Sequence, residues 1–329
     1  MTQETRARVV LAAGAAVAGL LLSEVALRLI GFSYVIAPQG VEFGWPNPKV
    51  MQSRYKTDPD LFWVTNDYAA KLDHLRQGRP DLIFMGDSCT EFGGYPAEFL
   101  KLARAAHPGG LPLAEQVGVS GYTSLQGLRQ LQRDVAPLSP RVVTLFYGWN
   151  DHWLGFGVED DQVQWVTHSW LARMDRLRLG QLLVKTWMAA SAGRRSTWPR
   201  RVPPDDFRRN LREMAQVAAA HGILAVLLTA PTSHRVGHEP RHLAERWLKD
   251  VGELVPLHAR YADMVREAGA ATGLPVCDVA RKVEALTPEE RAADFMSDGI
   301  HFTDSGNKAI AAMLLDCFET EPALRAALD

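Results

Sequence analysis

Ser88 stands at the point where an apolar segment of the sequence turns polar. The segment "LIFM" (82–85) has the character of a buried strand, and Gly-Asp-Ser follows it. Gly86 permits a tight turn, so that Ser88 arrives near a helix N-terminus with its backbone N–H unpaired. A serine hydroxyl is a useful nucleophile only when an adjacent base takes its proton. Taken alone, Ser88 is better explained as a helix N-cap, and a catalytic role depends on distant residues.

Three further polar segments could complete a site for acyl transfer. The segment "SDGIHFTDSG" places Asp298 three residues before His301, so that a base and an orienting carboxylate share one turn. The segment "GVSGYTS" contains Gly121, which lets a backbone N–H approach a ligand closely. The segment "YGWND" contains Asn150, whose side-chain amide can donate to an oxygen. With Ser88, these residues supply a nucleophile, a base and donors for an oxyanion.

The elements that position these segments form a strand–helix alternation. Helical spacing after Pro203 places Phe207, Leu211, Met214 and Ala218 on one face, and another helix begins at Thr303. Short aliphatic runs are typical of buried parallel strands, and their alternation with helices predicts an α/β/α sandwich. Ligands bind such sheets outside the carboxyl ends of the strands. The expected strands are 82–85, 114–119, 142–147, 223–229 and 274–279.

The four polar segments resemble, in order and spacing, the motifs of the SGNH hydrolase superfamily (GDSL-type esterases and lipases) over about residues 80–320. "GDS" matches its nucleophile block, "GVSGYTS" its glycine block, "GWND" its Gly-x-Asn-Asp block and "DGIH" its Asp-x-x-His block. The resemblance implies that Ser88 is the nucleophile, His301 the base and Asp298 its orienting carboxylate. It also implies an oxyanion hole formed by the N–H groups of Ser88 and Gly121 with the Asn150 amide. The implied fold is a flavodoxin-like three-layer sandwich with a five-stranded parallel sheet.

Two positions depart from the pattern of this superfamily. Gln116 stands where an Asn often precedes the glycine block, and Cys89 follows the nucleophile in place of a hydrophobic residue. Neither departure removes a catalytic atom. Cys89 is expected to be a small buried side chain. Gln116 leaves open what supports the glycine block.

The N-terminal segment predicts a membrane anchor. Arg6 and Arg8 precede an apolar run over residues 9–22, and continuation to Ile30 gives a helix of about 33 Å, enough to cross a membrane. Glu24 and Arg28 can then pair near the interface. A cleaved signal peptide stays open as an alternative. The arginines place the N-terminus in the cytoplasm, so the catalytic part would be periplasmic or at the cell surface.

The chain therefore divides into a membrane anchor (1–31), a connector and lead-in (32–80) and a hydrolase domain (81–325) with an insertion at 152–202. Tryptophans gather in and beside this insertion. Most should pack in a helical cap, but Trp149 and Trp153, near Asn150, are expected to line the substrate site. The cluster comprises Trp149, Trp153, Trp165, Trp170, Trp187 and Trp198.

Composition excludes several other classes of protein. A formal charge of −2 and a pI near 6.6 give no basic surface for nucleic acid. The three cysteines have no metal-ligand spacing and form no disulfide framework. His234, His238 and His242 recur every four residues, but Pro240 interrupts a helix there, which favours a solvated loop over a zinc site. We expect no metal or organic cofactor.

The sequence predicts a serine esterase that acts on a small-molecule, glycan or lipid ester. An O-acyltransferase with a sugar hydroxyl as acceptor would use the same catalytic residues and stays open. A non-catalytic glycan-binding protein on this fold is the third reading, and the complete catalytic set argues against it. The acyl chain, the alcohol part of the substrate and the oligomeric state are not determined by these motifs.

Overall fold

The central sheet has five parallel strands, as predicted. The computed structural model describes residues 2–33, 53–108, 113–155, 159–162, 176–191, 198–243 and 248–328. The strands are β3 (Leu82–Gly86), β4 (Ala114–Gln116), β5 (Val142–Phe146), β6 (Leu224–Leu228) and β7 (Val276–Cys277). They lie in the order β4-β3-β5-β6-β7, with every neighbouring pair parallel. Counted along the chain this is the flavodoxin-like order 2-1-3-4-5, which confirms the predicted fold class.

The two edge strands are shorter than the sequence predicts. β4 ends at Gln116. The N–H groups of Val117 and Val119 still donate to the carbonyls of Phe84 and Gly86, so the chain stays beside β3 as far as Val119. β7 has only two residues, where six were expected from the apolar run. An edge strand is paired on one side only, so it can leave the sheet where its side chains have other contacts.

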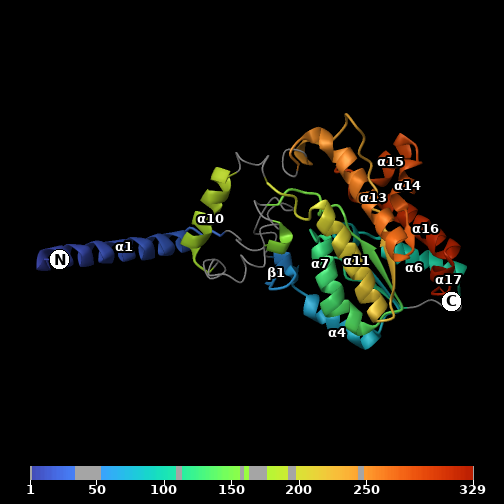
Figure 1. Ribbon diagram of the computed structural model, residues 1–329, viewed down its shortest axis with the longest axis horizontal. Coiled ribbons are helices and arrows are strands. Elements are labelled where there is room, and N and C mark those ends of the chain that lie inside the picture. The colour runs from blue at the N-terminus through green and yellow to red at the C-terminus, as the bar shows by residue number, and fades with distance from the viewer. Residues whose placement is uncertain are drawn as a thin grey trace.

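Helices cover both faces of the sheet. α6 (Tyr95–Ala106) packs against α16 (Asp304–Thr320), whereas α11 (Pro204–Ala220) packs against both α7 (Ser124–Gln130) and α13 (Leu254–Thr272). Figure 1 shows α7 and α11 on one side of the strands and α6 and α16 on the other. Phe207, Leu211, Met214 and Ala218 are buried along α11, so the predicted face of this helix is confirmed. The other helices of the sandwich are α4 (Tyr68–Gly78), α5 (Ser88–Glu91), η1 (Leu131–Val135), η2 (Ala136–Leu138), η4 (Val251–Glu253), α14 (Val279–Glu284), α15 (Pro288–Asp294) and α17 (Pro322–Arg325).

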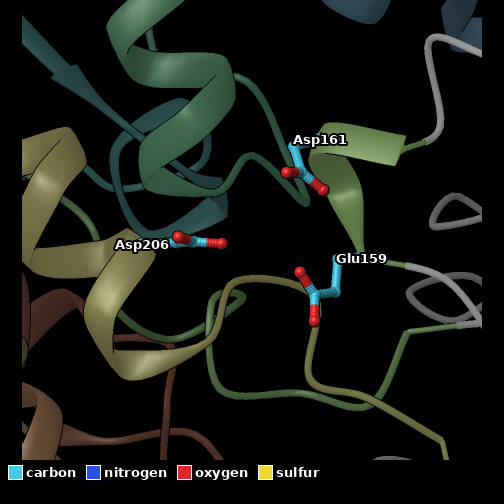
Figure 2. Close-up of side chains that lie close together, drawn as sticks. All are labelled: Glu159, Asp161 and Asp206. Atoms are coloured by element: carbon cyan, nitrogen blue, oxygen red, sulfur yellow. The ribbon is translucent and has the colours of Figure 1, made fainter.

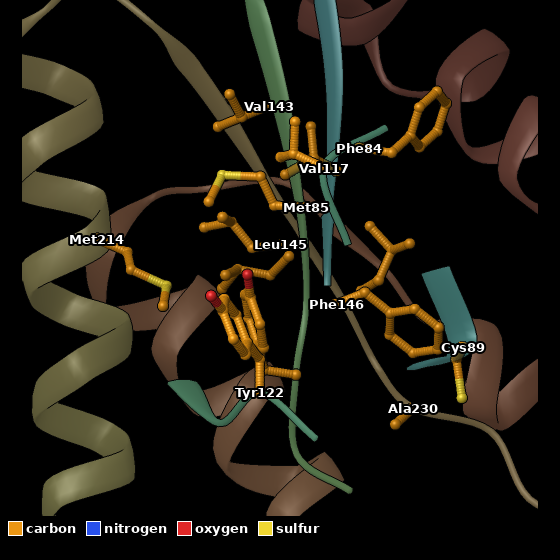
Figure 3. Close-up of a cluster of buried hydrophobic side chains, with 14 of the residues drawn as sticks. Phe84, Met85, Cys89, Val117, Tyr122, Val143, Leu145, Phe146, Met214 and Ala230 are labelled. Atoms are coloured by element: carbon orange, nitrogen blue, oxygen red, sulfur yellow. The ribbon is translucent and has the colours of Figure 1, made fainter. Parts of the chain in front are cut away.

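The core lies between the sheet and these helices. Met85, Leu145 and Met214 gather on the α11 side, and Phe84 and Phe146 lie on the opposite side of the strands (Figure 3). The side chains from Leu82 to Met85 are at most 1% exposed. Full burial of one such side chain stabilises the fold by roughly 1.5–3 kcal/mol. The turn after Gly86 is therefore attached to the most rigid part of the molecule.

A hairpin that precedes the predicted hydrolase domain shares the same core. β1 (Tyr55–Asp58) pairs antiparallel with β2 (Phe62–Thr65), and Leu61, Trp63 and Val64 are at most 3% exposed. These side chains belong to one hydrophobic cluster with the residues of the sheet. We therefore propose that the catalytic domain begins near Tyr55 rather than at residue 81. The Gly- and Pro-rich part of the predicted connector, residues 34–52, lies outside the described residues.

The N-terminal helix α1 (Gln3–Leu29) extends away from the sandwich (Figure 1). It is long and apolar enough to cross a membrane, and no part of its apolar window is buried. A signal sequence near the N-terminus would meet the same criteria. Arg28 donates to Glu24 at 2.8 Å, which is the pair expected from their spacing.

One disulfide joins the last strand to the last long helix. Cys277 of β7 is bonded to Cys317 of α16, and Cys89 is a free, buried thiol. The bridge ties an edge strand to the helix layer beside it. Disulfides persist mainly in oxidising compartments.

Candidate active site

Ser88, His301 and Asp298 lie in one hydrogen-bonded line at the carboxyl edge of the sheet. The Ser88 Oγ is 2.8 Å from His301 Nε2, and His301 Nδ1 is 2.6 Å from Asp298 Oδ2. The other Asp298 oxygen accepts the backbone N–H groups of Ile300 and His301. These bonds hold the carboxylate against the imidazole. The arrangement is the one that lets a serine hydroxyl lose its proton to a histidine.

The turn that carries Asp298 and His301 is held by the loop after β6. His234 Nε2 donates to the Asp298 carbonyl at 2.6 Å, and Thr232 Oγ1 donates to the Gly299 carbonyl. A Cβ on Gly299, whose φ is +70°, would lie 2.4 Å from His234, so only glycine fits between them. His234 is 7% exposed, whereas His238 is exposed. The expectation of a solvated loop is therefore wrong for His234, because its ring packs under the turn.

Burial and neighbouring charges shift the pKa values of His301, Asp298 and Asp87. Burial would lower the pKa of His301, but the hydrogen bond and charge of Asp298, with the charge of Asp87, outweigh burial and raise it. Burial would raise the pKa of Asp298, but its bond to His301 and that ring's charge lower the pKa to about 2. Burial raises the pKa of Asp87 to about 6. At neutral pH, Asp298 is therefore an anion that favours the imidazolium formed when Ser88 loses its proton.

Activity is expected to fall as the pH falls through the pKa of His301. The neutral imidazole is the base, and its pKa is raised, so kcat/KM should decline on the acid side of a midpoint above about 6.5. The profile of p-nitrophenyl acetate hydrolysis from about pH 5 to about pH 9 measures this. Asp87→Asn removes a charge that helps to raise the pKa of His301, so it should move this midpoint to lower pH without abolishing the acid limb. A profile that is flat through this range would contradict the role of His301 as base.

Cys89 follows Ser88 but is not placed to be a nucleophile. Its side chain is 1% exposed, and its Sγ lies 3.7 Å from the Ile300 carbonyl. Burial, with the nearby charges of Asp87 and Asp298, raises the pKa of the thiol well above its usual value. A protonated thiol is a poor nucleophile. The buried position agrees with the expectation for this residue.

The three groups expected to bind an oxyanion come from the ends of neighbouring strands. In the described part of the chain, the backbone N–H groups of Ser88 and Gly121 donate to no carbonyl or side chain. Asn150 Nδ2 donates to Asp87 Oδ2 at 2.9 Å, so the amide nitrogen lies beside the residue that precedes Ser88. An amide nitrogen carries two hydrogens, so one stays available for a second acceptor.

Asn150→Ala is expected to lower kcat on the order of 10²–10³-fold with little change in KM. The amide is only half-buried, so the substitution removes a donor without opening the core. Steady-state kinetics on a p-nitrophenyl ester measure both constants. Asn66→Ala removes an exposed amide that donates to the Ser53 carbonyl and is the matched control. A rise in KM alone would make Asn150 a ground-state binder.

The glycine block is supported by residues that the motif does not contain. Gln116 Oε1 accepts the N–H of Gly118, so this glutamine stabilises the loop where an Asn is more usual. Gly121 has a φ of +77°, and a Cβ there would lie 3.0 Å from the Trp63 ring. Glycine is needed here for its left-handed conformation and for the approach of Trp63. The Cβ position faces that ring, so close approach to a ligand is not the constraint on this residue.

Trp149 and Trp153 are buried, contrary to their expected place beside the substrate. They are 2% and 4% exposed, and the Trp149 ring stacks on His258 with a centroid separation of 3.7 Å. His152 contacts His258 at 3.1 Å, and burial lowers the pKa of both histidines. A ring enclosed in this way has no face for a ligand. Trp198 is also buried; Trp165, Trp170 and the side chain of Trp187 lie outside the described residues.

Three carboxylates meet at a second place on the surface. Glu159, Asp161 and Asp206 can bring oxygens within 4.8 Å of one another, and Figure 2 shows them converging from two segments. Asp206 is also paired with Arg209. Exposed carboxylates often lie close together without an ion, so the cluster alone assigns no metal site.

Ser88, His301 and Asp298 are thus aligned at the carboxyl edge of a parallel sheet, which is where such sheets bind ligands. The model of the GDSL-like lipase/acylhydrolase family matches residues 84–309. The chain belongs to this family. No curated protein sequence matches it.

Solved structures with a similar fold include hydrolases of bacterial origin. The lipase/acylhydrolase from Enterococcus faecalis is 20% identical, with a TM-score of 0.46, over 71% of this chain and 93% of that chain. A GDSL-like lipase from Bacteroides thetaiotaomicron is 18% identical, with a TM-score of 0.47, over 79% and 96%. An acetyl xylan esterase, AlAXEase, is 17% identical, with a TM-score of 0.46, over 71% and 98%.

Proposed function

We propose that this protein is a serine esterase that hydrolyses carboxylic esters. Ser88 attacks the ester carbonyl while His301 Nε2 takes the hydroxyl proton. The negative charge that forms on the carbonyl oxygen is held by the N–H groups of Ser88 and Gly121 and by the Asn150 amide. His301 then gives its proton to the leaving alcohol, and water attacks the acyl-enzyme in the second half of the reaction. The alignment of the Ser88 hydroxyl, His301 and Asp298 carries this proposal.

We further propose that α1 stays attached as a membrane anchor and that the catalytic domain lies outside the cytoplasm. Arg6 and Arg8 before the apolar run favour a cytoplasmic N-terminus. The Cys277–Cys317 disulfide is a second, independent support, since such bonds are rare in reducing compartments. An enzyme in this position would meet esters of envelope glycans or lipids.

Hydrolysis of p-nitrophenyl esters from acetate to palmitate, with and without glycan acceptors, tests the proposal. We expect release of free acid to exceed acyl transfer at every chain length, and the optimum length to identify the acyl group. Ser88→Ala should be inactive on the whole series. An acyl-enzyme that turns over only when a sugar hydroxyl is added would show an O-acyltransferase. The absence of turnover on every ester, with correctly folded protein, would contradict the enzymatic assignment of these residues.

A further inference from the structure

Helix α10 (Arg178–Ser191) is attached to the end of α1 by a half-buried carboxylate, that of Glu24. Glu24 accepts the backbone N–H groups of Arg178 at 3.0 Å and Leu179 at 2.8 Å, which belong to the first turn of α10. Arg28 donates to Glu24 and also to the Arg176 carbonyl at 2.9 Å. The Glu24 side chain is only 15% exposed. Both charged residues of the outer part of α1 are thus used to hold a segment about 150 residues away in sequence.

These bonds fix the depth of α10 if α1 crosses a membrane. Glu24 lies about 9 Å along the helix axis before Ile30. A charged pair is strongly disfavoured in the hydrocarbon core, so Glu24 and Arg28 place that part of α1 at the lipid headgroups. The first turn of α10 must lie at the same level. Figure 1 shows α10 crossing the end of α1, between α1 and the sandwich, rather than running alongside it.

The side chains of α10 suit a lipid interface. Gly180 and Gln181 are buried, whereas Leu183 is 56% exposed and Leu177, just before the helix, is 50% exposed. Arg178 and Lys185 supply positive charge on the same short segment. Helices that combine exposed apolar residues with Lys and Arg lie in the plane of the bilayer surface. Leu29, one residue after Arg28 in α1, is 82% exposed.

We propose that α10 is a second membrane contact that lies in the outer lipid interface, with Leu177 and Leu183 facing the acyl chains. This proposal rests on the proposed anchoring by α1 and goes beyond it. One helix alone would leave the catalytic domain free to rotate and tilt about its connection. A second contact restricts that motion, so that the edge of the sheet carrying Ser88 keeps a limited range of orientations above the lipid surface.

The test places a fluorophore at single positions of the full-length protein in liposomes of phosphatidylcholine and phosphatidylglycerol. Three cysteine variants are compared: Leu183→Cys in α10, Leu21→Cys in α1 and Val236→Cys on the sandwich, where Val236 is 74% exposed. The native thiols do not interfere, because Cys89 is buried and the other two are bonded. Spin-labelled lipids then report depth by quenching. We expect quenching by shallow labels at position 183, by deep labels at position 21 and by neither at position 236.

The outcomes distinguish a failure of this proposal from a failure of the proposed anchoring by α1 or of the proposed esterase activity. Quenching at position 21 with none at position 183 would overturn the membrane contact of α10 and leave the anchor standing. No quenching at either position would overturn both. If fluorescence at position 183 depended on protein density and was not quenched by lipid, α10 would contact a second copy of the protein. That result would also overturn the membrane contact of α10. Ester hydrolysis by each labelled variant reports on the catalytic proposal independently.

A second observation concerns how the glycine block is oriented. Trp63 Nε1 donates to the Ser120 carbonyl at 2.8 Å, and Arg201 Nη1 donates to the Gly121 carbonyl at 2.7 Å. The N–H of Ser120 donates to Glu91. Trp63 and Arg201 are each 2% exposed, and Arg201 is itself held by Asp160. Both carbonyls of the Ser120–Gly121 pair therefore accept a hydrogen bond from a buried side chain.

In a trans peptide the C=O and the following N–H point in opposite directions. The bond from Trp63 to the Ser120 carbonyl therefore turns the Gly121 N–H the other way, where it stays unbonded. We infer that Trp63 is a positioning residue, which aims the Gly121 N–H at the oxyanion. It comes from the β1–β2 hairpin, outside every motif that carries a catalytic group.

Trp63→Phe keeps an aromatic ring beside Gly121 and removes the N–H donor. We expect kcat to fall about 10- to 100-fold with KM unchanged, and the affinity for a boronic acid transition-state analogue to fall by the same factor. Tyr68→Phe removes another buried hydrogen bond, to Asp134, and should change neither kcat nor the affinity for the analogue. Unchanged kcat and analogue affinity in folded Trp63→Phe would overturn the inference. If that variant does not fold, Trp63→Tyr, which also lacks the indole N–H, is measured for kcat and for affinity for the analogue in the same way.

Discussion

Ser88→Ala is expected to lower kcat for ester hydrolysis on the order of 10⁵- to 10⁶-fold, because no other group in the site can form the acyl-enzyme. The thermal unfolding midpoint should hardly change. Ser88 is half-buried, and among the described residues its hydroxyl bonds only to His301, so its loss should cost less than about 1 kcal/mol. Active-site kinetics and a circular dichroism melt of the same preparation measure both effects.

The matched control for this change is Ser305→Ala. Ser305 lies in the first turn of α16, and its hydroxyl donates to the Ala293 carbonyl. It should keep full activity. Turnover in Ser88→Ala within about 10-fold of the parent would mean that water, activated by His301, attacks the ester directly. That result would remove the covalent step from the proposed mechanism.

Asp298→Asn is expected to lower kcat about 10⁴-fold and to move the pH profile. The amide cannot stabilise the imidazolium, and it favours the wrong tautomer of His301. Because the charge of Asp298 raises the pKa of His301, its removal should shift the acid limb of the kcat/KM profile to lower pH. Asp304→Asn, an exposed acid in the same region of the chain, should change neither. A large loss of kcat with an unmoved acid limb would show that Asp298 only shapes the turn.

The sequence was sufficient to predict the fold and to place the candidate catalytic residues at one edge of it. Three of the motifs follow apolar runs such as 82–85 or 142–147, and parallel strands bring their carboxyl ends together. The fourth, with Asp298 and His301, comes just before the last long helix. The edge strands are shorter than their apolar runs because they have one neighbour in place of two. Their true ends depend on contacts with helices, which a local pattern does not contain.

The supporting contacts could not be predicted in the same way. Trp63, Arg201 and His234 act on residues 57, 80 and 64 positions away, and none belongs to a motif. Residues 32–80 were expected to be a connector and lead-in, and nothing in their sequence indicated that Trp63 would be part of the core. The prediction for Trp149 was wrong in the opposite sense. Its place beside Asn150 suggested that it lines the substrate site, whereas its ring is buried against His258. Burial of a large side chain is set by tertiary packing and not by its neighbours in sequence.

Reaction with a fluorophosphonate, followed by mass spectrometry of the digested protein, tests the central claim most directly. The reagent is attacked only by a hydroxyl whose proton is taken by an adjacent base, so it reports the Ser88–His301 pair in the working enzyme. We predict one modified residue, Ser88, with loss of esterase activity in proportion to labelling. His301→Ala should abolish the reaction. Modification at Cys89 or at any other residue, or full activity after complete labelling of Ser88, would contradict the account.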